Sequence, residues 1–224
     1  VPRLAKDRRV CIDRKGPSIF DRIEITLYHD IMSSSFITNK EKFLSDIING
    51  ILPKTNAADI LVGYFYFSGY VQLPENLKDK QIRVLVGLDV DLQISGHICE
   101  VETIRKRLIS RGAVKEEYYE QLAKLINESD FLDTAEKQEQ FKMFYGKVLD
   151  GTLEIRKTLE PCHSKMYLFA YNDLVNEGGE LPGVLITGSS NLSYQGLKGR
   201  LELNARFNDK QDYDEGKRLF DELW

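Results

Sequence analysis

A segment in the last third of the chain carries two side chains with the chemistry to act on a phosphate ester. His163 and Lys165 are two residues apart in the stretch 163–171, whose composition predicts a β-strand, so both side chains would leave the same face. Histidine exchanges a proton near neutral pH, and a lysine ammonium donates to anionic oxygens. On its own, the pair is more typical of a hydrogen-bonded strand histidine beside a solvated lysine.

Two more donors follow the next predicted strand, residues 183–187. Ser189 and Asn191 lie just past its end, where sheet proteins commonly place ligand groups. A hydroxyl and an amide suit the non-bridging oxygens of a phosphodiester, over which negative charge is spread in the transition state. The default interpretation of the same two residues is that they shape a turn.

A carboxylate completes the set. Glu202 lies eleven residues beyond Asn191, in a predicted strand 201–207, and alternates there with two leucines and an alanine, so we expect it to face away from these apolar residues. It could then hold the imidazole in one tautomer, as carboxylates do behind other catalytic histidines. The alternative is an ion pair with Arg200 or Arg206. No cluster of His, Cys, Asp or Glu has the spacing of a metal site, so we expect neither a metal nor a cofactor.

The ordered motifs His163-x-Lys165, Gly188-Ser189-Ser190-Asn191 and Glu202 resemble the signature of the phospholipase D superfamily, in its bacterial nuclease branch. Residues 60–69 and 191–197 look like the phospholipase D-type domains that precede superfamily-2 helicase motors or occur in restriction endonucleases. The resemblance implies a metal-independent nuclease or related phosphodiesterase that acts on DNA through a phosphohistidine formed at His163. One position departs from the family, which often has Asp where this chain has Ala170.

The same resemblance implies that a second histidine protonates the leaving oxygen. The other histidines, His29 and His97, lack a lysine two residues on, so one chain carries half of a site. We therefore expect a homodimer through the active-site face, with one site shared by two copies of His163. The alternative is a non-catalytic module that binds the DNA phosphate backbone or DNA ends within a helicase or restriction system.

Periodicity places these motifs in an α/β (α+β layered) domain, and the resemblance implies a phospholipase D-like mixed sheet flanked by helices. Helical spacing and a capping box at Thr38 and Glu41 predict a helix that ends at Pro53, and apolar spacing predicts a closing helix after residue 210. Residues 98–146 have helical stripes only, ended at Gly146, and predict a helical lobe that is either inserted into the α/β sheet or packed against it. The strands are predicted at 60–67, 82–90, 153–157, 163–171, 183–187 and 201–207.

The overall composition is that of a globular protein, and it sets the expected boundaries. The net charge of −4 over 224 residues argues against a protein that coats nucleic acid by bulk charge. Residues 1–35 are expected to be an N-terminal extension, and 36–224 the catalytic domain. The missing initiator Met, and the helical pattern still running at Trp224, suggest a fragment of a longer polypeptide in which a helicase domain could follow. Three cysteines without a framework, and no apolar run of membrane length, favour a cytoplasmic protein without a membrane anchor.

Three features have both a purely structural and a functional interpretation. The basic start of the chain fits a solvated tail better than a phosphate-binding arm, and the basic patch within 105–111 fits a solvated helix face better than a DNA contact. The aromatic run Tyr64–Phe67 fits a buried core better than a platform for stacking bases.

Overall fold

The computed structural model describes residues 35–73, 77–90 and 134–224. The chain divides into two units between residues 34 and 35, and every described residue belongs to the second unit. The predicted N-terminal extension, the first two helices of the predicted lobe, the 105–111 patch, His29 and His97 lie outside the described residues.

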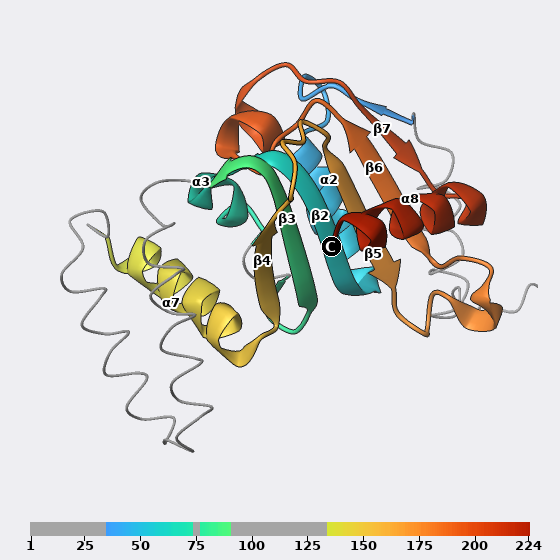
Figure 1. The fold of residues 1–224 in the computed structure, drawn as a ribbon, viewed down its shortest axis with the longest axis horizontal. Helices are drawn as coiled ribbons and strands as arrows, with labels where there is room; N and C mark the ends of the chain where they lie inside the picture. The colour runs from blue at the N-terminus through green and yellow to red at the C-terminus, as the bar shows by residue number, and fades with distance from the viewer. Residues whose placement is uncertain (1–34, 74–76, 91–133) are drawn as a thin grey trace, which may run out of the picture. The chain divides into compact units, whose positions relative to one another are not determined.

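A seven-stranded mixed sheet forms the centre of the second unit, in the order β1-β7-β6-β5-β2-β3-β4 (Figure 1). The β2–β3 and β3–β4 pairs are parallel, and the other pairs are antiparallel. This arrangement confirms the predicted mixed sheet flanked by helices. The strands are β1 (Phe36–Ile37), β2 (Thr55–Phe65), β3 (Gln81–Val90), β4 (Leu153–Lys157), β5 (Met166–Tyr171), β6 (Gly183–Gly188) and β7 (Asn204–Phe207).

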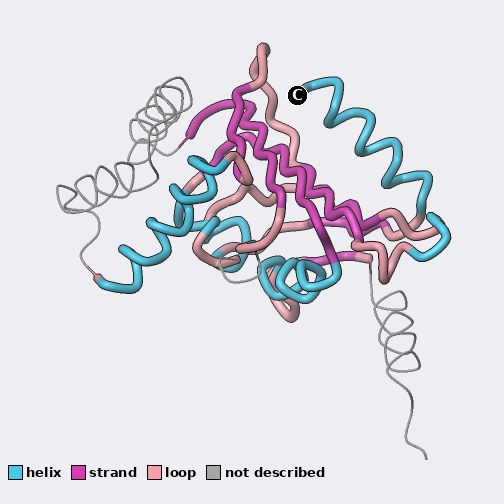
Figure 2. Tube along the Cα trace, turned by 90° about the horizontal axis from the view of Figure 1, so that it is seen from below, coloured by secondary structure: helices cyan, strands magenta, loops and turns pink. Residues whose placement is uncertain are grey.

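The central strands are apolar on both faces because helices cover both sides. In β2, Ile60 and Val62 enter one core and Leu61 enters the other. Figure 2 shows the C-terminal helix on one side of the sheet and the helices Leu44–Ile51 and Ala135–Asp150 on the other. The helical elements are α2 (Leu44–Ile51), η1 (Leu52–Lys54), α3 (Phe67–Tyr70), α7 (Ala135–Asp150), η2 (Glu177–Gly179), η3 (Gln195–Gly199) and α8 (Lys210–Leu223).

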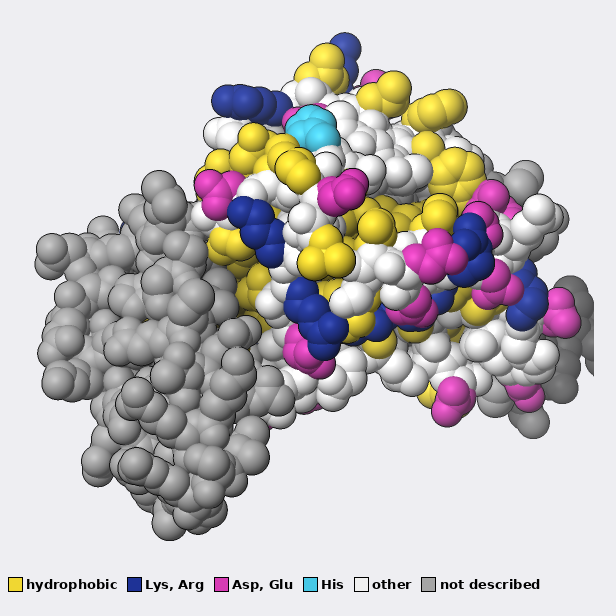
Figure 3. Space-filling model, in the orientation of Figure 1, with side chains coloured by type: hydrophobic (Ala, Val, Ile, Leu, Met, Phe, Trp, Pro, Cys, Tyr) yellow, Lys and Arg dark blue, Asp and Glu magenta, His cyan; other side chains and the backbone are white. Residues whose placement is uncertain are grey.

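The closing helix α8 packs through fewer residues than its sequence predicts. Tyr213 and Phe220 are buried against Leu61, Leu85, Leu168 and Leu185. Leu219 and Leu223, which share the helical apolar spacing of Tyr213 and Phe220, are exposed. Charged residues occupy the rest of the helix, and Figure 3 shows acidic and basic side chains interspersed over it.

Helix α7 packs into the main core and extends beyond Gly146, where the sequence predicts its end. Phe141 and Phe144 pack edge-to-face against Phe67, with ring centroids 5.7 and 5.5 Å away. The helix continues through Gly146 and ends at Gly151, whose φ of 79° is the left-handed conformation of a C-cap. The rest of the predicted lobe, up to residue 133, lies outside the described residues.

The start of α2 also differs from its prediction. No side chain caps the helix at its N-cap residue Phe43, so the capping box at Thr38 and Glu41 is wrong. Instead Leu44 N donates to Asn39 Oδ1 at 2.8 Å, and Asn39 Nδ2 donates to the carbonyl of Gly196 at 2.8 Å. This long-range contact ties the helix to the loop after β6. The α-helix ends at Ile51, next to Pro53 as predicted, and Pro53 itself lies in the 3₁₀ turn η1.

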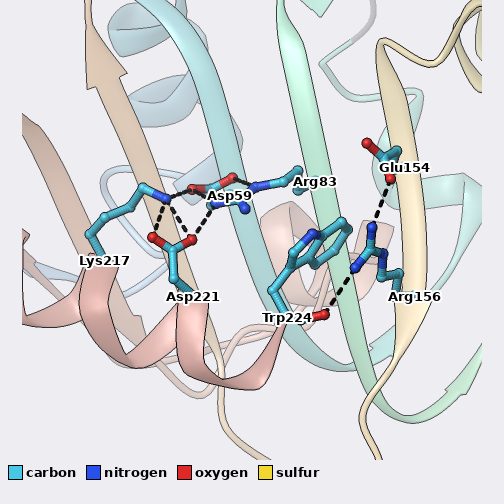
Figure 4. A network of polar contacts seen from close by, with 7 residues as sticks. All are labelled: Asp59, Arg83, Glu154, Arg156, Lys217, Asp221 and Trp224. Carbon is cyan, nitrogen blue, oxygen red and sulfur yellow. Dashed lines mark hydrogen bonds and ion pairs between the residues drawn. The ribbon is translucent and has the colours of Figure 1, made fainter.

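An ion-pair network joins α8 to the sheet (Figure 4). Arg83 on β3 donates to both carboxylate oxygens of Asp59 at 2.6 and 2.7 Å and to Asp221 at 2.7 Å. Its guanidinium also lies 4.9 Å from the ring centroid of Phe220 and 5.1 Å from that of Trp224. The side chain of Asp59 is only 11 % exposed, so the bidentate pair is largely shielded from solvent.

Replacing Arg83 with methionine is expected to lower the free energy of unfolding by about 1–3 kcal/mol, because Asp59 loses a charge-assisted bidentate partner in a partly buried position. Urea denaturation of the two proteins measures the change. Arg218→Met is the matched control: within the described residues Arg218 pairs with Glu215 and Glu222 on the exposed surface of α8, and its loss should change stability little. If Arg83→Met and the unmodified chain unfolded at the same urea concentration, the Arg83–Asp59 pair could not be stabilising the fold.

None of the helices among the described residues is long and apolar enough to cross a membrane.

Candidate active site

His163 and Lys165 are in direct contact at the start of β5. Both precede the strand, which begins at Met166 rather than at His163 as predicted. Lys165 Nζ lies 2.9 Å from His163 Nε2 and donates to the His163 carbonyl at 2.6 Å. An ammonium has only donors, so a charged Lys165 requires Nε2 to be the acceptor, with its lone pair directed toward Lys165. Lys165 is 5 % exposed while His163 is exposed, so the imidazole is the accessible member of the pair.

A β-bulge in β3 holds the segment that carries His163. Val62 pairs with Val86 but Tyr64 pairs with Asp89, so β3 has one extra residue at this point. The Gly87 carbonyl there accepts from Cys162 N at 3.0 Å. The backbone of Cys162 lies so close to Gly87 that a Cβ on Gly87 would overlap it. The bulge therefore fixes the residue that precedes the histidine.

Asn191 reaches the site by docking onto the end of β2. Its Oδ1 accepts from Tyr64 N at 3.0 Å, and Leu192 O accepts from Tyr66 N at 2.9 Å. Asn191 and His163 both flank Gly63, where a Cβ would lie 3.4 Å from Asn191 Oδ1 and 3.1 Å from His163 Cδ2. Among the described residues the Asn191 Nδ2 has no hydrogen-bond partner, so this donor is available to a ligand.

Ser189 and Glu202 form a second contact pair. The Ser189 hydroxyl donates to Glu202 Oε2 in a short hydrogen bond and accepts from Leu203 N at 3.0 Å. Residues 201–203 precede β7 instead of belonging to it, and Leu201 and Leu203 are exposed, so the expected apolar side of this segment is wrong. In the described part of the chain Glu202 contacts Ser189, and it makes neither the expected hydrogen bond to the His163 imidazole nor the alternative ion pair with Arg200 or Arg206.

The turn between these residues rests on a buried amide that the sequence analysis did not single out. Asn204, which is fully buried, donates to Ser190 Oγ at 2.9 Å and accepts from Ser190 N at 3.3 Å. Tyr167 donates through its hydroxyl to the Ser190 carbonyl at 2.9 Å. These bonds hold the Ser189–Asn191 turn against β5 and β7.

Electrostatics links the two contact pairs. Burial lowers the pKa of Lys165 below its ordinary value, and the negative charge of Glu202 partly opposes that shift. Glu202 and Asn191 also line one pocket of about 400 Å³, together with Tyr64, Tyr66, Ser68, Ser193, Gln195, Gly196 and Arg200. The structure thus brings the five predicted residues to one end of the sheet.

The sequence analysis did not assign Gly63, Tyr64, Tyr66, Gln195 or Arg200 to the site, although some of them carry a signal. A glycine inside an apolar strand, as at Gly63, is typical of a close approach by another segment. Period-two alternation also predicts that Tyr64 and Tyr66 face away from Phe65 and Phe67. Gln195 and Arg200 carry no such signal, because the turn η3 that positions them is irregular.

Ala170, at the position where the family often has Asp, lies on the other face of the sheet from Lys165. It packs beside the apolar layer under α8, together with Met166 and Leu168. An alanine fits this apolar environment without requiring a polar partner.

The mixed sheet, with a histidine–lysine pair at the start of one central strand and a Ser-x-Asn turn after the next, defines a phospholipase D-like domain. A family model described as "Cardiolipin synthase, PLD-like domain" matches residues 59–224. This match covers most of the chain, and the chain belongs to this phospholipase D-like family. A search of curated proteins found no match.

Several solved structures are similar in fold at low sequence identity. Polyphosphate kinase from Porphyromonas gingivalis is 12 % identical with a TM-score of 0.44, over 89 % of this chain and 24 % of that protein. NucT from Helicobacter pylori is 10 % identical with a TM-score of 0.43, over 85 % and 94 %. The archaeal chromatin protein TrmBL2 is 9 % identical with a TM-score of 0.37, over 92 % and 59 %. This chain therefore spans about a quarter of the polyphosphate kinase, and likenesses at this level carry no argument about activity.

Proposed function

We propose that the chain hydrolyses phosphodiesters in DNA without a metal, through a phosphohistidine at His163 in a site shared by two subunits. The observation that carries the proposal is the exposed His163 imidazole, whose Nε2 lies 2.9 Å from the buried ammonium of Lys165. Asn191 supplies a free amide donor nearby. DNA as the substrate follows from the resemblance of the motifs to the nuclease branch of the family.

The proposed reaction has two displacement steps. When phosphate binds, the Lys165 ammonium exchanges its bond to Nε2 for a bond to a non-bridging oxygen. The freed Nε2 lone pair of His163 attacks phosphorus, the bond from phosphorus to the leaving oxygen breaks, and a second imidazole donates a proton to that oxygen. Lys165 and Asn191 stabilise the negative charge on the non-bridging oxygens. Water then attacks the phosphohistidine and gives its proton to the second imidazole, and the P–N bond breaks to release the phosphate and His163.

A second copy of the chain would supply the second imidazole. A residue that meets its own copy across a twofold axis must be exposed in the isolated chain. His163 meets this condition. Exposed leucines lie close in sequence to both contact pairs of the site. Leu159 precedes His163, and Leu201 and Leu203 flank Glu202. Their burial against a partner would favour a dimer through this face.

The proposal is tested by hydrolysis in the presence of a chelator. We expect cleavage of oligonucleotides and of bis(4-nitrophenyl) phosphate to persist in excess EDTA, and rapid denaturation during turnover to trap a ³²P-labelled, acid-labile link to His163. Cleavage that EDTA abolishes would overturn the mechanism. A module that only binds phosphate would retain DNA but give neither cleavage nor a covalent link.

The charge of Glu202 should set the alkaline limit of activity. Lys165 stabilises phosphate oxygens only while protonated, and Glu202 raises the pKa that burial has lowered. Replacing Glu202 with glutamine keeps an acceptor for Ser189 but removes the charge, so the pKa of Lys165 falls further. The alkaline decline of kcat/KM should therefore begin at lower pH in Glu202→Gln. Glu160→Gln removes an exposed carboxylate close in sequence to His163 and should leave the profile in place; an unshifted profile in Glu202→Gln would refute the coupling.

A further inference from the structure

The aromatic run at the end of β2 divides between the core and the candidate site. Phe65 and Phe67 are buried in the main core. Tyr64 is half-buried and Tyr66 is 41 % exposed, and their rings stack with centroids 6.4 Å apart and planes 26° apart. The expectation of a wholly buried run is therefore wrong for the two tyrosines, which line the pocket.

One tyrosine of the pair, Tyr64, lies beside His163. The ring of Tyr64 meets the imidazole of His163 edge-on, with centroids 6.4 Å apart and planes at 80°. Tyr66 continues the row outward from Tyr64. A phosphate held at His163 and Lys165 would therefore have an aromatic surface within reach of its own nucleotide.

We infer that Tyr64 and Tyr66 form a nucleobase-stacking subsite, with Gln195 and Arg200 beside it, and that the site accepts DNA in which the nucleotide next to the scissile phosphate is unpaired. This inference rests on the proposed function, because it places the base relative to a phosphate at His163. It specifies that the DNA substrate is unpaired at the site, whereas the sequence motifs do not distinguish single-stranded from duplex DNA.

The chemistry of the pocket matches a nucleotide. Its volume of about 400 Å³ is in the range of small-ligand sites. An exposed tyrosine ring can stack on any base, the Gln195 amide can both donate to and accept from a base edge, and the exposed Arg200 guanidinium can bind a neighbouring phosphate. Such a mixture of aromatic, amide and guanidinium groups is typical of proteins that bind single strands.

The position of the subsite excludes a base that remains in a duplex. A paired base is covered on both faces by its neighbours, so it can stack on Tyr66 only after it leaves the helix. Unpaired DNA avoids that cost. The row of rings from His163 to Tyr66 therefore favours single strands, flaps or frayed ends over intact duplex.

The test compares oligonucleotides with and without a base at one position. Binding is measured by fluorescence anisotropy in the 224-residue chain carrying His163→Ala, so that no substrate is cleaved. We expect single-stranded DNA to bind about 5- to 100-fold more tightly than the same strand with abasic sites, and Tyr66→Ala to reduce that ratio toward one. Tyr66→Phe keeps the ring and should keep the ratio, and Phe36→Ala removes an exposed aromatic residue outside the pocket and should also keep it.

The outcomes separate this inference from the proposed function. A base-dependent ratio that survives Tyr66→Ala, or tighter binding of intact duplex than of single strands, would overturn the subsite even if the chain hydrolyses DNA. Conversely, a ratio lost in Tyr66→Ala and kept in Tyr66→Phe would support the subsite even if no cleavage were observed. Circular dichroism checks that each variant is folded; the backbone bond from Tyr66 N to Leu192 O does not require the ring.

Discussion

Replacing His163 with alanine is expected to reduce phosphodiester hydrolysis by at least about 10⁴-fold, because the change removes the nucleophile and, in a shared site, also the general acid. The fold should be unaffected. His163 is exposed, and the Lys165 ammonium keeps its bond to the backbone carbonyl of residue 163. Initial rates on bis(4-nitrophenyl) phosphate measure the loss, and thermal unfolding shows whether structure is retained. A variant that keeps a tenth or more of the activity would exclude the phosphohistidine mechanism.

The same variant tests whether two subunits share one site. When equal amounts of unmodified chain and His163→Ala are allowed to exchange subunits, mixed dimers carry a single histidine and should be inactive, so the activity per unmodified chain should fall to about half. Independent sites would leave the activity per unmodified chain unchanged. Sedimentation at the assay concentration shows whether dimers form, and a monomer with full activity would refute the shared site.

The sequence predicted which side chains lie together better than it predicted the backbone that supports them. The spacing of His163, Lys165, Ser189, Asn191 and Glu202 is a local property of the chain, and the structure brings all five to one end of the sheet. Their roles remain predictions that the variants above test.

The strands β5 and β7 were each predicted to begin three residues too early. Tertiary contacts determine where these two strands begin. His163 and Lys165 lie before β5 because the bond from Cys162 N to Gly87 O redirects the chain. Glu202 lies before β7 because Ser189 accepts from Leu203 N. Neither bond joins residues close in sequence, so periodicity cannot reveal them.

The packing of helix α7 is likewise set by tertiary contacts. Its aromatic stripe is visible in the sequence, but a stripe does not say which core it enters. The ring centroid of Phe144 lies 4.8 Å from that of Tyr70. Tyr70 belongs to the short helix α3, which begins directly after Tyr66. The aromatic cluster therefore supports the tyrosine end of the pocket as well as closing the core.

Replacing Gly87 with alanine is expected to reduce kcat by about 10²-fold, by moving a catalytic group that it does not touch. A Cβ at this position would lie 2.6 Å from the carbonyl carbon of Cys162 and would overlap the carbonyl oxygen. These are backbone atoms, so the segment that leads into His163 must shift, and the imidazole must move relative to Lys165. The strain should also lower the free energy of unfolding by about 1–3 kcal/mol.

Two measurements separate this displacement from simple unfolding. Gly50→Ala, in the interior of α2 where a Cβ meets nothing within 4 Å, is the matched glycine control and should keep full activity. Gly87→Ala should remain folded at the assay temperature and lose kcat there, because the steric conflict is confined to the Cys162 segment. If Gly87→Ala turned over substrate at the unmodified rate, the bulge in β3 could not be what positions the histidine, since the carbonyl of Cys162 has nowhere to go without carrying His163 with it.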